Sequence, residues 1–367
     1  MDVIRVMYGD LEVGRMRDES GRYTFAYSRD WLAKGFSISP LSLPLEDRAF
    51  TVKDNYFNGL FGVFADSLPD GWGTYAAIKA LRSKGISYLN LDPLQKLSLI
   101  GEDGLGALHY LPSDGICSRT DERDLDTICR ECMSILDEDR DVDLDDVFVR
   151  AGSTGGARPK VNHCMGGEEW IVKFRERRDP SSAGRMEYEY NLAAKECGID
   201  VPEVMLIPSK TCDGFFASKR FDRVNGRRVH MVTLGGLLEV PHDLPLLDYH
   251  TFLQATGFVT HSQAEIEKAF RLACFNILAG NLDDHSKNFA YLYSESKKGY
   301  VLSPAYDLTR TPNLREHEMT CMGEGSPTVD DLTALADAVR IPKRKASGVI
   351  SMVEKVVGER LSEWVQL

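Results

Sequence analysis

The most informative pattern in the chain consists of two segments, NLDDHSKN (residues 281–288) and PAYDL (residues 304–308). Asp283 and Asn288 are five residues apart, and Asp307 follows nineteen residues after Asn288. Carboxylate and amide oxygens are the ligands that Mg²⁺ prefers in proteins. The pattern therefore predicts that the Asn288 amide and the Asp307 carboxylate hold a divalent cation, with the Asp283 carboxylate close by.

These groups are the ones that phosphoryl transfer from ATP requires. A carboxylate must orient the attacking hydroxyl, while an amide oxygen and a second carboxylate hold the magnesium. Asp283 and Asn288 have the spacing of the catalytic Asp and the metal-binding Asn in the kinase loop H-R-D-L-x-x-x-N. We therefore predict that Asp283 is catalytic and that Asn288 and Asp307 bind Mg²⁺. Lys287 is expected to contact the transferring phosphate.

The same loop can be interpreted as a polar turn after a buried helix, because Asn, Asp, Ser and His are common turn residues. The helix expected over residues 264–278 has an apolar stripe that we predict to be core, made of Ile266, Phe270, Ala273 and Ile277. Within the loop, His285 is expected to be a buried structural hydrogen-bonding residue. Asp284 is expected to be a solvated neighbour of Asp283.

A second candidate region, residues 150–157, is expected to be a flexible Gly-rich loop. Glycine has no Cβ, so such a loop can pass close to phosphate oxygens and direct backbone N–H groups at them. We predict that the ATP phosphates are bound here, by Ser153, Thr154, Gly155 and Gly156. A plain turn is the alternative, since the loop matches neither G-x-G-x-x-G nor the Walker pattern.

Lys173 lies in the otherwise apolar run WIVKF (residues 170–174). An unpaired ammonium in a buried strand is costly, and kinases provide the ATP phosphates and a Glu from the next helix as its partners. Glu187 is our first choice for that Glu, and Glu189 is the alternative. The other interpretation is an edge-strand lysine whose ammonium reaches solvent.

The composition of the chain is that of an ordinary globular protein: 367 residues, of which 43% are hydrophobic and 27% charged. No run approaches the eighteen apolar residues of a membrane span, and nothing at the N-terminus suggests secretion. The net charge of −12 argues against direct DNA binding and fits a basic protein partner. The eight cysteines have no framework spacing, and Cys129 and Cys132 are expected to be helix-surface or half-buried thiols. A reducing, cytoplasmic location is the simplest interpretation.

Three parts are expected along the chain: a β-rich subdomain over residues 1–112, a kinase N-lobe over 113–235 and a helical C-lobe over 236–367. Residues 31–45 are expected to be extended, and the acidic stretch 113–146 to be a connector with one helix. Strands are predicted at residues 3–13 (a hairpin turning at Gly9 and Asp10), 23–27, 160–163, 170–174, 204–207 and 214–219, and residues 104–110 are expected to be a loop that enters a strand. Helices are predicted at residues 72–83, 94–100, 124–137, 185–197, 249–254, 264–278, 330–339 and 348–364.

Taken in order, these segments resemble the HipA family of bacterial toxin serine/threonine kinases. SLPDGWG (residues 67–73) and GLGAL (104–108) resemble the N-terminal unit of that family, and STGGARPK (153–160) resembles its phosphate loop. KRFDR (219–223) resembles the segment after the interlobe hinge. DDHSKNF (283–289) and PAYDL (304–308) resemble the catalytic and metal motifs. The resemblance extends from about residue 1 to 340.

The resemblance implies an α+β, two-lobed protein-kinase-like fold with a small β-rich N-terminal subdomain and a mainly helical C-lobe. It implies ATP and Mg²⁺ as cofactors, with backbone around Ser218, Lys219 and Phe221 holding the adenine. It further implies autophosphorylation at Ser153, which would add about two negative charges where the ATP phosphates bind. The implied partners are a HipB-like helix-turn-helix antitoxin, through which DNA is bound indirectly, and a translation-related protein substrate such as an aminoacyl-tRNA synthetase.

Two other functions fit parts of the pattern. A small-molecule or lipid kinase of related fold also uses D-x-x-x-x-N followed by Asp, but the SLPDGWG motif favours the toxin family. A catalytically silent, kinase-like antitoxin-binding co-repressor is the second alternative. The presence of Lys173, Asp283, Asn288 and Asp307 together argues against it.

Overall fold

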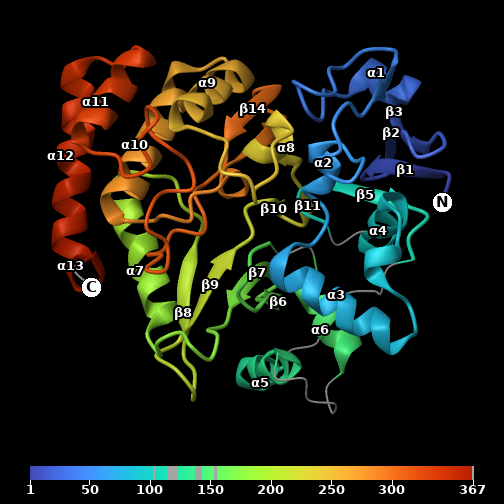
Figure 1. Cartoon of the computed structure of the whole chain (residues 1–367), viewed down its shortest axis with the longest axis horizontal. Helices are drawn as coiled ribbons and strands as arrows, with labels where there is room; N and C mark the ends of the chain where they lie inside the picture. Colours follow the sequence, from blue (N-terminus) through green and yellow to red (C-terminus); the bar gives the residue numbers. More distant parts are fainter. Residues whose placement is uncertain (102–103, 115–122, 137–142, 153–154, 366–367) are drawn as a thin grey trace. The chain divides into compact units, whose positions relative to one another are not determined.

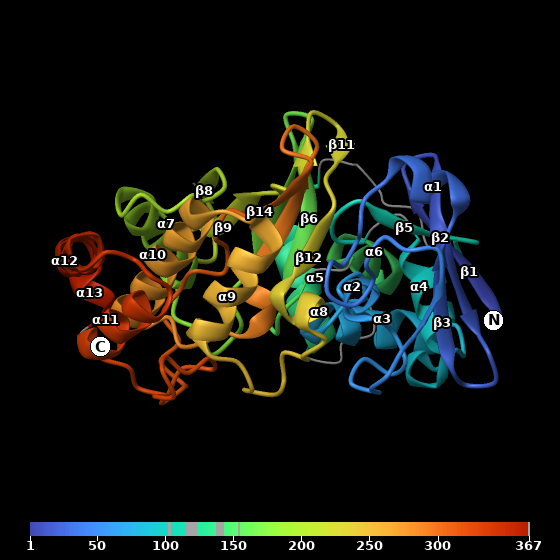
Figure 2. The same cartoon turned by 90° about the horizontal axis from the view of Figure 1, so that it is seen from above.

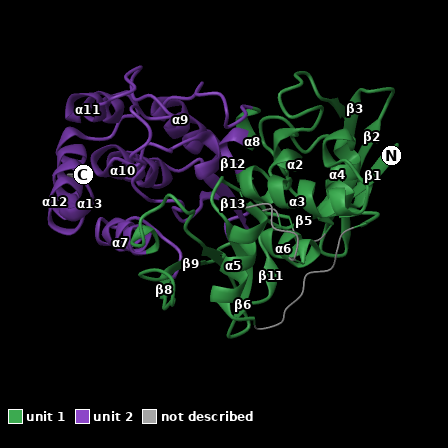
Figure 3. Cartoon of the chain, turned by 60° about the horizontal axis from the view of Figure 1, so that its bottom comes forward, with its two compact units in different colours: residues 1–184, 205–232, 236–239 green, residues 185–204, 233–235, 240–367 purple. Residues whose placement is uncertain are grey.

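The computed structural model describes the whole chain except residues 102–103, 115–122, 137–142, 153–154 and 366–367 (Figure 1). The chain divides into two compact units (Figure 3). Unit 1 comprises residues 1–184, 205–232 and 236–239, and unit 2 comprises residues 185–204, 233–235 and 240–367.

Unit 1 begins with an antiparallel sheet in the order β4-β3-β2-β1-β5. Its strands are β1 (Val3–Tyr8), β2 (Leu11–Asp18), β3 (Tyr23–Tyr27), β4 (Ala49–Thr51) and β5 (Leu108–Leu111). In β1 the alternation of side chains buries Ile4 and Val6 completely and leaves Val3 exposed, as a sheet with one covered face requires. The predicted hairpin is confirmed, because Tyr8 pairs with Leu11 across the turn.

The helices of this part are α1 (Arg29–Lys34), α2 (Gly62–Ala65), α3 (Gly71–Ser83) and α4 (Pro93–Ile100), with a 3₁₀ turn η1 (Tyr88–Asn90). The predictions for α3 and α4 are confirmed. The prediction that residues 31–45 are extended is wrong at its start, where α1 lies. Ser28 caps this helix by accepting a hydrogen bond from the Trp31 N–H, and Trp31 anchors it with only 3% of its surface exposed.

The second sheet of unit 1 has the order β6-β7-β9-β8. Its strands are β6 (Lys160–Met165), β7 (Glu168–Lys173), β8 (Val204–Ile207) and β9 (Phe215–Lys219), all of them predicted. The short strands β10 (Arg223–Val224) and β11 (Arg227–Arg228) form a separate hairpin.

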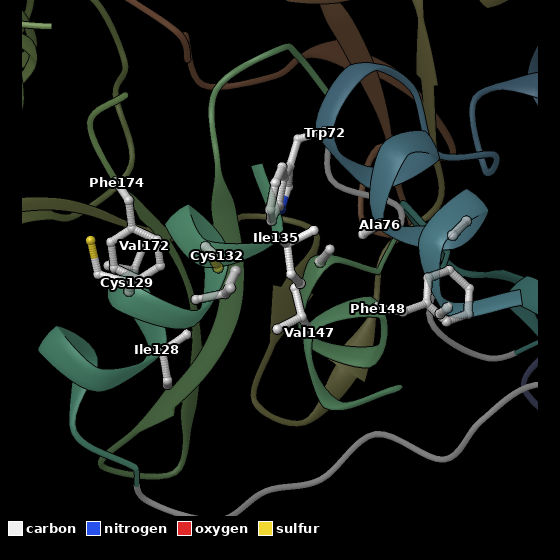
Figure 4. Packing of buried hydrophobic residues seen from close by; sticks show 14 of the residues in the cluster. Trp72, Ala76, Ile128, Cys129, Cys132, Ile135, Val147, Phe148, Val172 and Phe174 are labelled. Atoms are coloured by element: carbon white, nitrogen blue, oxygen red, sulfur yellow. The ribbon is translucent and has the colours of Figure 1, made fainter. Parts of the chain in front are cut away.

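Helices α5 (Leu125–Leu136) and α6 (Leu144–Ala151) belong to the same core as this sheet. Figure 4 shows how their buried side chains pack with Trp72 of α3 and Phe174 at the end of β7. Cys129 and Cys132 are buried here, with 8% and 0% of their surface exposed, so the prediction of surface or half-buried thiols is wrong. Burial raises the pKa of Cys129 to about 11. The residues predicted as a connector therefore contribute to the core.

Unit 2 is mainly helical. Its helices are α7 (Ala183–Glu196, in this unit from Arg185), α9 (Tyr249–Thr260), α10 (Gln263–Ala279), α11 (Val329–Ala338), α12 (Lys343–Arg360) and α13 (Ser362–Val365). Figure 2 shows α10 between α9 and α12, and both helices contact it. A hairpin that was not predicted, β13 (Ala290–Ser294) and β14 (Gly299–Leu302), follows the turn η2 (Ser286–Asn288). Strand β12 (Met231–Thr233) and helix α8 (Leu234–Leu238) contain residues of both units.

The α+β class is confirmed, because the described residues form four sheets, of five, four, three and two strands, together with the helices given above. Among the residues that the structure describes, no helix is both long and apolar enough to cross a membrane.

Candidate active site

The predicted site residues are divided between the two units. Unit 1 contains Gly155, Gly156, Lys173, Ser218, Lys219 and Phe221. Unit 2 contains Glu187, Asp283, Lys287, Asn288 and Asp307. Ser153 and Thr154 lie outside the described residues.

The predicted catalytic loop is mounted on the end of α10. Three residues of the predicted core stripe are buried, with Phe270, Ala273 and Ile277 each at most 9% exposed, whereas Ile266 is only partly buried. Gly280 ends the helix in a left-handed conformation with φ +68°, which glycine adopts without strain. Asn281 then binds back to the helix, since its side-chain amide donates to Asn276 Oδ1 at 3.0 Å. The loop therefore starts from a fixed position.

Asp283 presents its side chain to solvent, with 52% of it exposed. Its main-chain oxygen accepts a hydrogen bond from Asn288 Nδ2 at 2.7 Å, which closes the loop over the five-residue spacing. His285 Nδ1 accepts from the Lys287 N–H at 3.3 Å, and its Nε2 lies 3.8 Å from Asp283 Oδ1. His285 is a structural hydrogen-bonding residue, as predicted, but it is partly exposed rather than buried. The loop thus holds an accessible carboxylate on a fixed backbone.

The unpredicted β13–β14 hairpin explains how Asp307 returns to this loop. At the open end of the hairpin the Ser303 N–H donates to the Ala290 oxygen at 2.9 Å. Tyr306 O–H then donates to the Lys287 oxygen at 2.5 Å, which links the residues next to Asp307 and Asn288. Asp307 itself has φ +55°, a conformation that is costly for a residue with a Cβ and that recurs at functional sites. Unit 2 therefore brings the two predicted magnesium-binding segments together.

The prediction that Asp284 is solvated is wrong. This residue is completely buried, and its Oδ2 accepts hydrogen bonds from Tyr249 O–H at 2.5 Å and from His317 Nδ1 at 2.6 Å. Its Oδ1 accepts from the Met319 N–H at 3.2 Å. Burial and the Asp284 carboxylate hold the pKa of Tyr249 well above its usual value. Asp284 fastens the loop to two distant segments, and no local sequence signal indicates this.

The surroundings of Asp283 are acidic. The Glu318 N–H donates to the Leu282 oxygen at 3.0 Å, which places Glu318 beside the loop. Burial, and then the charge of Asp283, raise the pKa of the Glu318 carboxyl. A cation bound near Asp283 would relieve this repulsion.

The donor set fits magnesium of the kind that phosphotransferases use. Among the described residues, no group of three or more His, Cys, Asp or Glu side chains is arranged to hold a metal by itself. Mg²⁺ usually takes one or two carboxylates and completes its shell with water and substrate phosphates. The Asp307 carboxylate and the Asn288 amide oxygen match that requirement, because the Asn288 Nδ2 is used by the Asp283 main-chain oxygen and Oδ1 is the atom of the amide that can bind a cation.

In unit 1, Lys173 ends strand β7 between Lys160 of β6 and Phe216 of β9. It is half-buried, and its ammonium lies 5.6 Å from the centre of the Phe216 ring. Lys160 is more deeply buried, with 6% exposed, and its ammonium donates to the Gly155 oxygen. Lys160 is therefore a cation at the Gly-rich loop, and it was not among the predicted site residues.

The Gly-rich loop is shorter than predicted. Helix α6 extends to Ala151, and Gly152 ends it with φ +52°. The prediction of a flexible loop beginning at Arg150 is therefore wrong, because Arg150 is a buried helical residue that forms an ion pair with Asp146 at 2.8 Å. Gly155 and Gly156 follow in irregular backbone, as predicted.

The segment predicted to hold adenine lies at the end of β9. Ser218 pairs with Ile171, and Lys219 pairs with Trp170 while its ammonium forms an ion pair with Glu168. Phe221 follows the strand and is partly buried.

This segment is fixed by buried charges. The Asp222 carboxylate accepts from Arg220 Nη2 at 2.8 Å, Arg223 Nη1 at 2.9 Å and the Gly106 N–H at 2.8 Å. Burial alone would raise the pKa of Asp222, but the two guanidinium charges outweigh it and hold the pKa below its usual range. Burial also lowers the pKa of Arg223 to about 10.

The two candidate partners of Lys173 differ within unit 2. Glu187 on α7 is buried, with 6% exposed. Glu189 is more exposed and lies 3.4 Å from Arg360 Nη1 of α12. Glu189 is therefore engaged on the α12 side of the helix.

Unit 1 has an antiparallel sheet that carries Lys173, and in unit 2 a helix leads into a loop with the Asp-x₄-Asn pattern. This combination defines the chain as a protein-kinase-like protein. Family models agree and are more specific. The HipA N-terminal domain matches residues 4–111, and the HipA-like C-terminal domain matches residues 152–361. The chain belongs to the HipA family.

Individual relatives are distant but similar in length. A protein of Sinorhizobium fredii named putative kinase Y4dM is 27% identical over 86% of this chain and 78% of its own length. The serine/threonine-protein kinase toxin HipA of Shewanella oneidensis is 22% identical over 97% of this chain and 87% of its own. A solved structure of the Shewanella oneidensis HipA, HipB and operator DNA complex matches with a TM-score of 0.73 and 20% identity. That match covers 98% of this chain and 90% of the solved one.

Proposed function

We propose that this protein is an ATP- and Mg²⁺-dependent serine/threonine protein kinase that acts as the toxin of a type II toxin–antitoxin system. The observation that carries the proposal is the loop of unit 2. There, an exposed Asp283 carboxylate is held on a backbone closed by Asn288, and the Tyr306–Lys287 hydrogen bond brings the Asp307 segment beside it. Kinase names among the relatives and membership of the HipA family support it.

In this proposal each residue has one role. Asp283 accepts the proton of the substrate hydroxyl as its oxygen attacks the terminal phosphorus of ATP, while the bond to ADP breaks. Asn288 and Asp307 would hold Mg²⁺, which supplies charge neutralisation at the phosphates. Lys287 contacts the transferring phosphate. In unit 1, Lys173 and the Gly-rich loop that contains Gly155 and Gly156 bind the phosphates, and backbone at Ser218, Lys219 and Phe221 holds adenine. Glu187 of unit 2 is the proposed partner of Lys173.

The proposed partners are a HipB-like antitoxin and a translation-related protein substrate such as an aminoacyl-tRNA synthetase. One relative occurs in a complex of HipA, HipB and operator DNA. The net charge of −12 supports DNA binding through the antitoxin rather than by this chain.

The decisive experiment compares phosphorylation by wild type and by Asp283→Ala. After short induction in cells, mass spectrometry should find phosphosites and growth should stop with the wild type but not with Asp283→Ala. Asp337→Ala, which removes an exposed carboxylate at the end of α11, is the matched control and should behave as wild type. Near-normal phosphorylation by Asp283→Ala would refute the assignment of the base. Transfer of radiolabel from ATP to lipids or sugars, but not to lysate proteins, would favour a small-molecule kinase.

Autophosphorylation at Ser153 has its own test. Negative charge on that residue would repel the ATP phosphates and silence the enzyme. A phosphopeptide map of the active enzyme over time should show Ser153 modified as activity falls. The Ser153→Ala variant should remain active. Inactivation of Ser153→Ala at the wild-type rate would contradict this part of the proposal.

A further inference from the structure

The start of helix α3 holds the Gly-rich loop within unit 1. Asp70 occupies the N-cap position of α3, where an Asp side chain ordinarily accepts a hydrogen bond from an N–H of the first helical turn. The Asp70 side chain makes no such bond. Its Oδ1 instead accepts from the N–H of Gly156, 86 residues later, at 2.5 Å. A favourable local interaction is replaced by a contact with the loop.

The contact is reciprocal. The Trp72 N–H, which has no partner inside the first turn of the helix, donates to the Gly156 oxygen at 2.9 Å. Trp72 is itself an anchor, because only 1% of the residue is exposed and it packs in the core of unit 1 (Figure 4). Both main-chain polar groups of Gly156 are thus bound by the start of α3.

The approach between helix and loop is close on both sides. Gly71 has φ +40°, and a Cβ built on it would lie 2.4 Å from the Gly156 oxygen, so only glycine fits there. A Cβ on Gly155 would lie 3.2 Å from Asp70 Oδ1. From β6, the buried Lys160 ammonium donates to the Gly155 oxygen. The exit of the loop is therefore fixed between α3 and β6.

We propose that Asp70 is a positioning residue for the ATP phosphates, through which the N-terminal part of the chain holds the Gly-rich loop ready for nucleotide. This inference rests on the proposed kinase function. Asp70 acts on the phosphates through the loop, because its carboxylate accepts from the Gly156 N–H. Gly156 therefore fixes the loop and does not itself donate to the phosphates. Fixing a loop before the ligand arrives removes an ordering cost from binding.

The test measures the dissociation constant of MgATP by calorimetry on the whole chain. Asp70→Ala should weaken MgATP binding about tenfold or more, the effect of losing one charge-assisted hydrogen bond. Asp70→Asn should bind nearly as wild type, because its amide oxygen can still accept from Gly156. Asp92→Ala is the matched control. Asp92 caps α4 in the same unit by accepting from the Gln95 N–H at 2.8 Å, so this change should lower stability and leave MgATP affinity unchanged.

A second measurement does not depend on nucleotide. Hydrogen–deuterium exchange of the peptide that contains Gly156 should be faster in Asp70→Ala and normal in Asp70→Asn. Unchanged exchange, or MgATP affinity equal to or tighter than wild type, in Asp70→Ala overturns the inference. A wild-type protein that binds no MgATP would instead overturn the proposed function, and the exchange experiment would still decide whether Asp70 holds the loop.

Discussion

Two adjacent aspartates of the catalytic loop have opposite environments. Asp283 is half exposed, whereas Asp284 is completely buried and accepts hydrogen bonds from Tyr249, His317 and the Met319 backbone. The five-residue spacing to Asn288 indicated Asp283, and Asp283 is the accessible one of the two aspartates. The spacing could not show that Asp284 is buried, because the donors come from residues 33 to 35 positions away.

This difference predicts that substitutions of the two aspartates have different effects on the free energy of unfolding. Asp284→Ala should lower the free energy of unfolding by about 3 kcal/mol or more, because it leaves several buried donors without an acceptor. Asp283→Ala should leave stability unchanged, since its carboxylate faces solvent. Urea unfolding of both variants provides the measurement. Equal unfolding midpoints for Asp284→Ala and wild type would show that the buried network contributes no stability.

A second prediction at this scale concerns His230. It is completely buried in unit 1, its Nε2 lies 2.8 Å from the Ile38 oxygen, and burial lowers its pKa to about 4. Below the unfolded pKa of about 6.5 the unfolded chain gains a proton that the folded chain resists. Stability from this group is therefore present above pH 6.5 and is lost as the pH falls toward 4, by about 3 kcal/mol in total.

The measurement is the difference in unfolding free energy between wild type and His230→Gln across that range, since Gln retains an N–H for Ile38. The difference should shrink as the pH falls. Glu239 opposes the effect in wild type, because burial raises its pKa to about 7, so its contribution is lost as the pH rises from 4.5 to 7. Glu239 is present in both proteins and cancels in the comparison. A difference that is constant with pH would exclude His230 as the titrating group.

At the scale of elements, strands and helices with strong periodicity were predictable and irregular ones were not. Strand β8 has the predicted ends, and α10 differs from its prediction by one residue at each end. Helix α1 was missed because its six residues carry too short a pattern, and a side-chain cap at Ser28 decides it. The β13–β14 hairpin was missed because it lies between two polar motifs in a helical region. Without this hairpin, the sequence does not explain how the segments of Asn288 and Asp307 come together.

The loop after β9 provides a prediction at this scale. Asp222 neutralises Arg220 and Arg223 in the interior of unit 1 and also receives the Gly106 N–H. Asp222→Ala would leave two buried guanidinium groups without this carboxylate and should cost about 3–5 kcal/mol of stability. Glu169→Ala is the control, because Glu169 is half exposed at 3.4 Å from Arg223 and its loss should cost less than about 1 kcal/mol. Similar thermal unfolding of both variants would contradict the ranking.

At the scale of the whole molecule, order along the chain was more informative than any single motif. A Gly-rich loop, a strand with Lys173, a helix with Glu187 and a late Asp-x₄-Asn loop are each common, but together they indicated the family that the domain models match. The division into two units was not predictable in detail. Residues 205–232 return to unit 1 after α7, and such long-range contacts leave no local signal.

Nucleotide binding gives a prediction for the whole molecule. A ligand that binds only the folded state stabilises it, by about 2.7 kcal/mol at a hundred times its dissociation constant. MgATP should therefore raise the thermal unfolding midpoint of wild type, and chelation of Mg²⁺ with EDTA should remove most of the rise. Asp307→Ala should lose the magnesium-dependent part, because it removes a proposed metal ligand. Asp283→Ala should keep the full rise, since in this proposal that carboxylate handles the proton of the substrate and not the nucleotide. No rise with saturating MgATP in wild type would contradict ATP use, and loss of the rise in Asp283→Ala would move that residue from the chemical step to nucleotide binding.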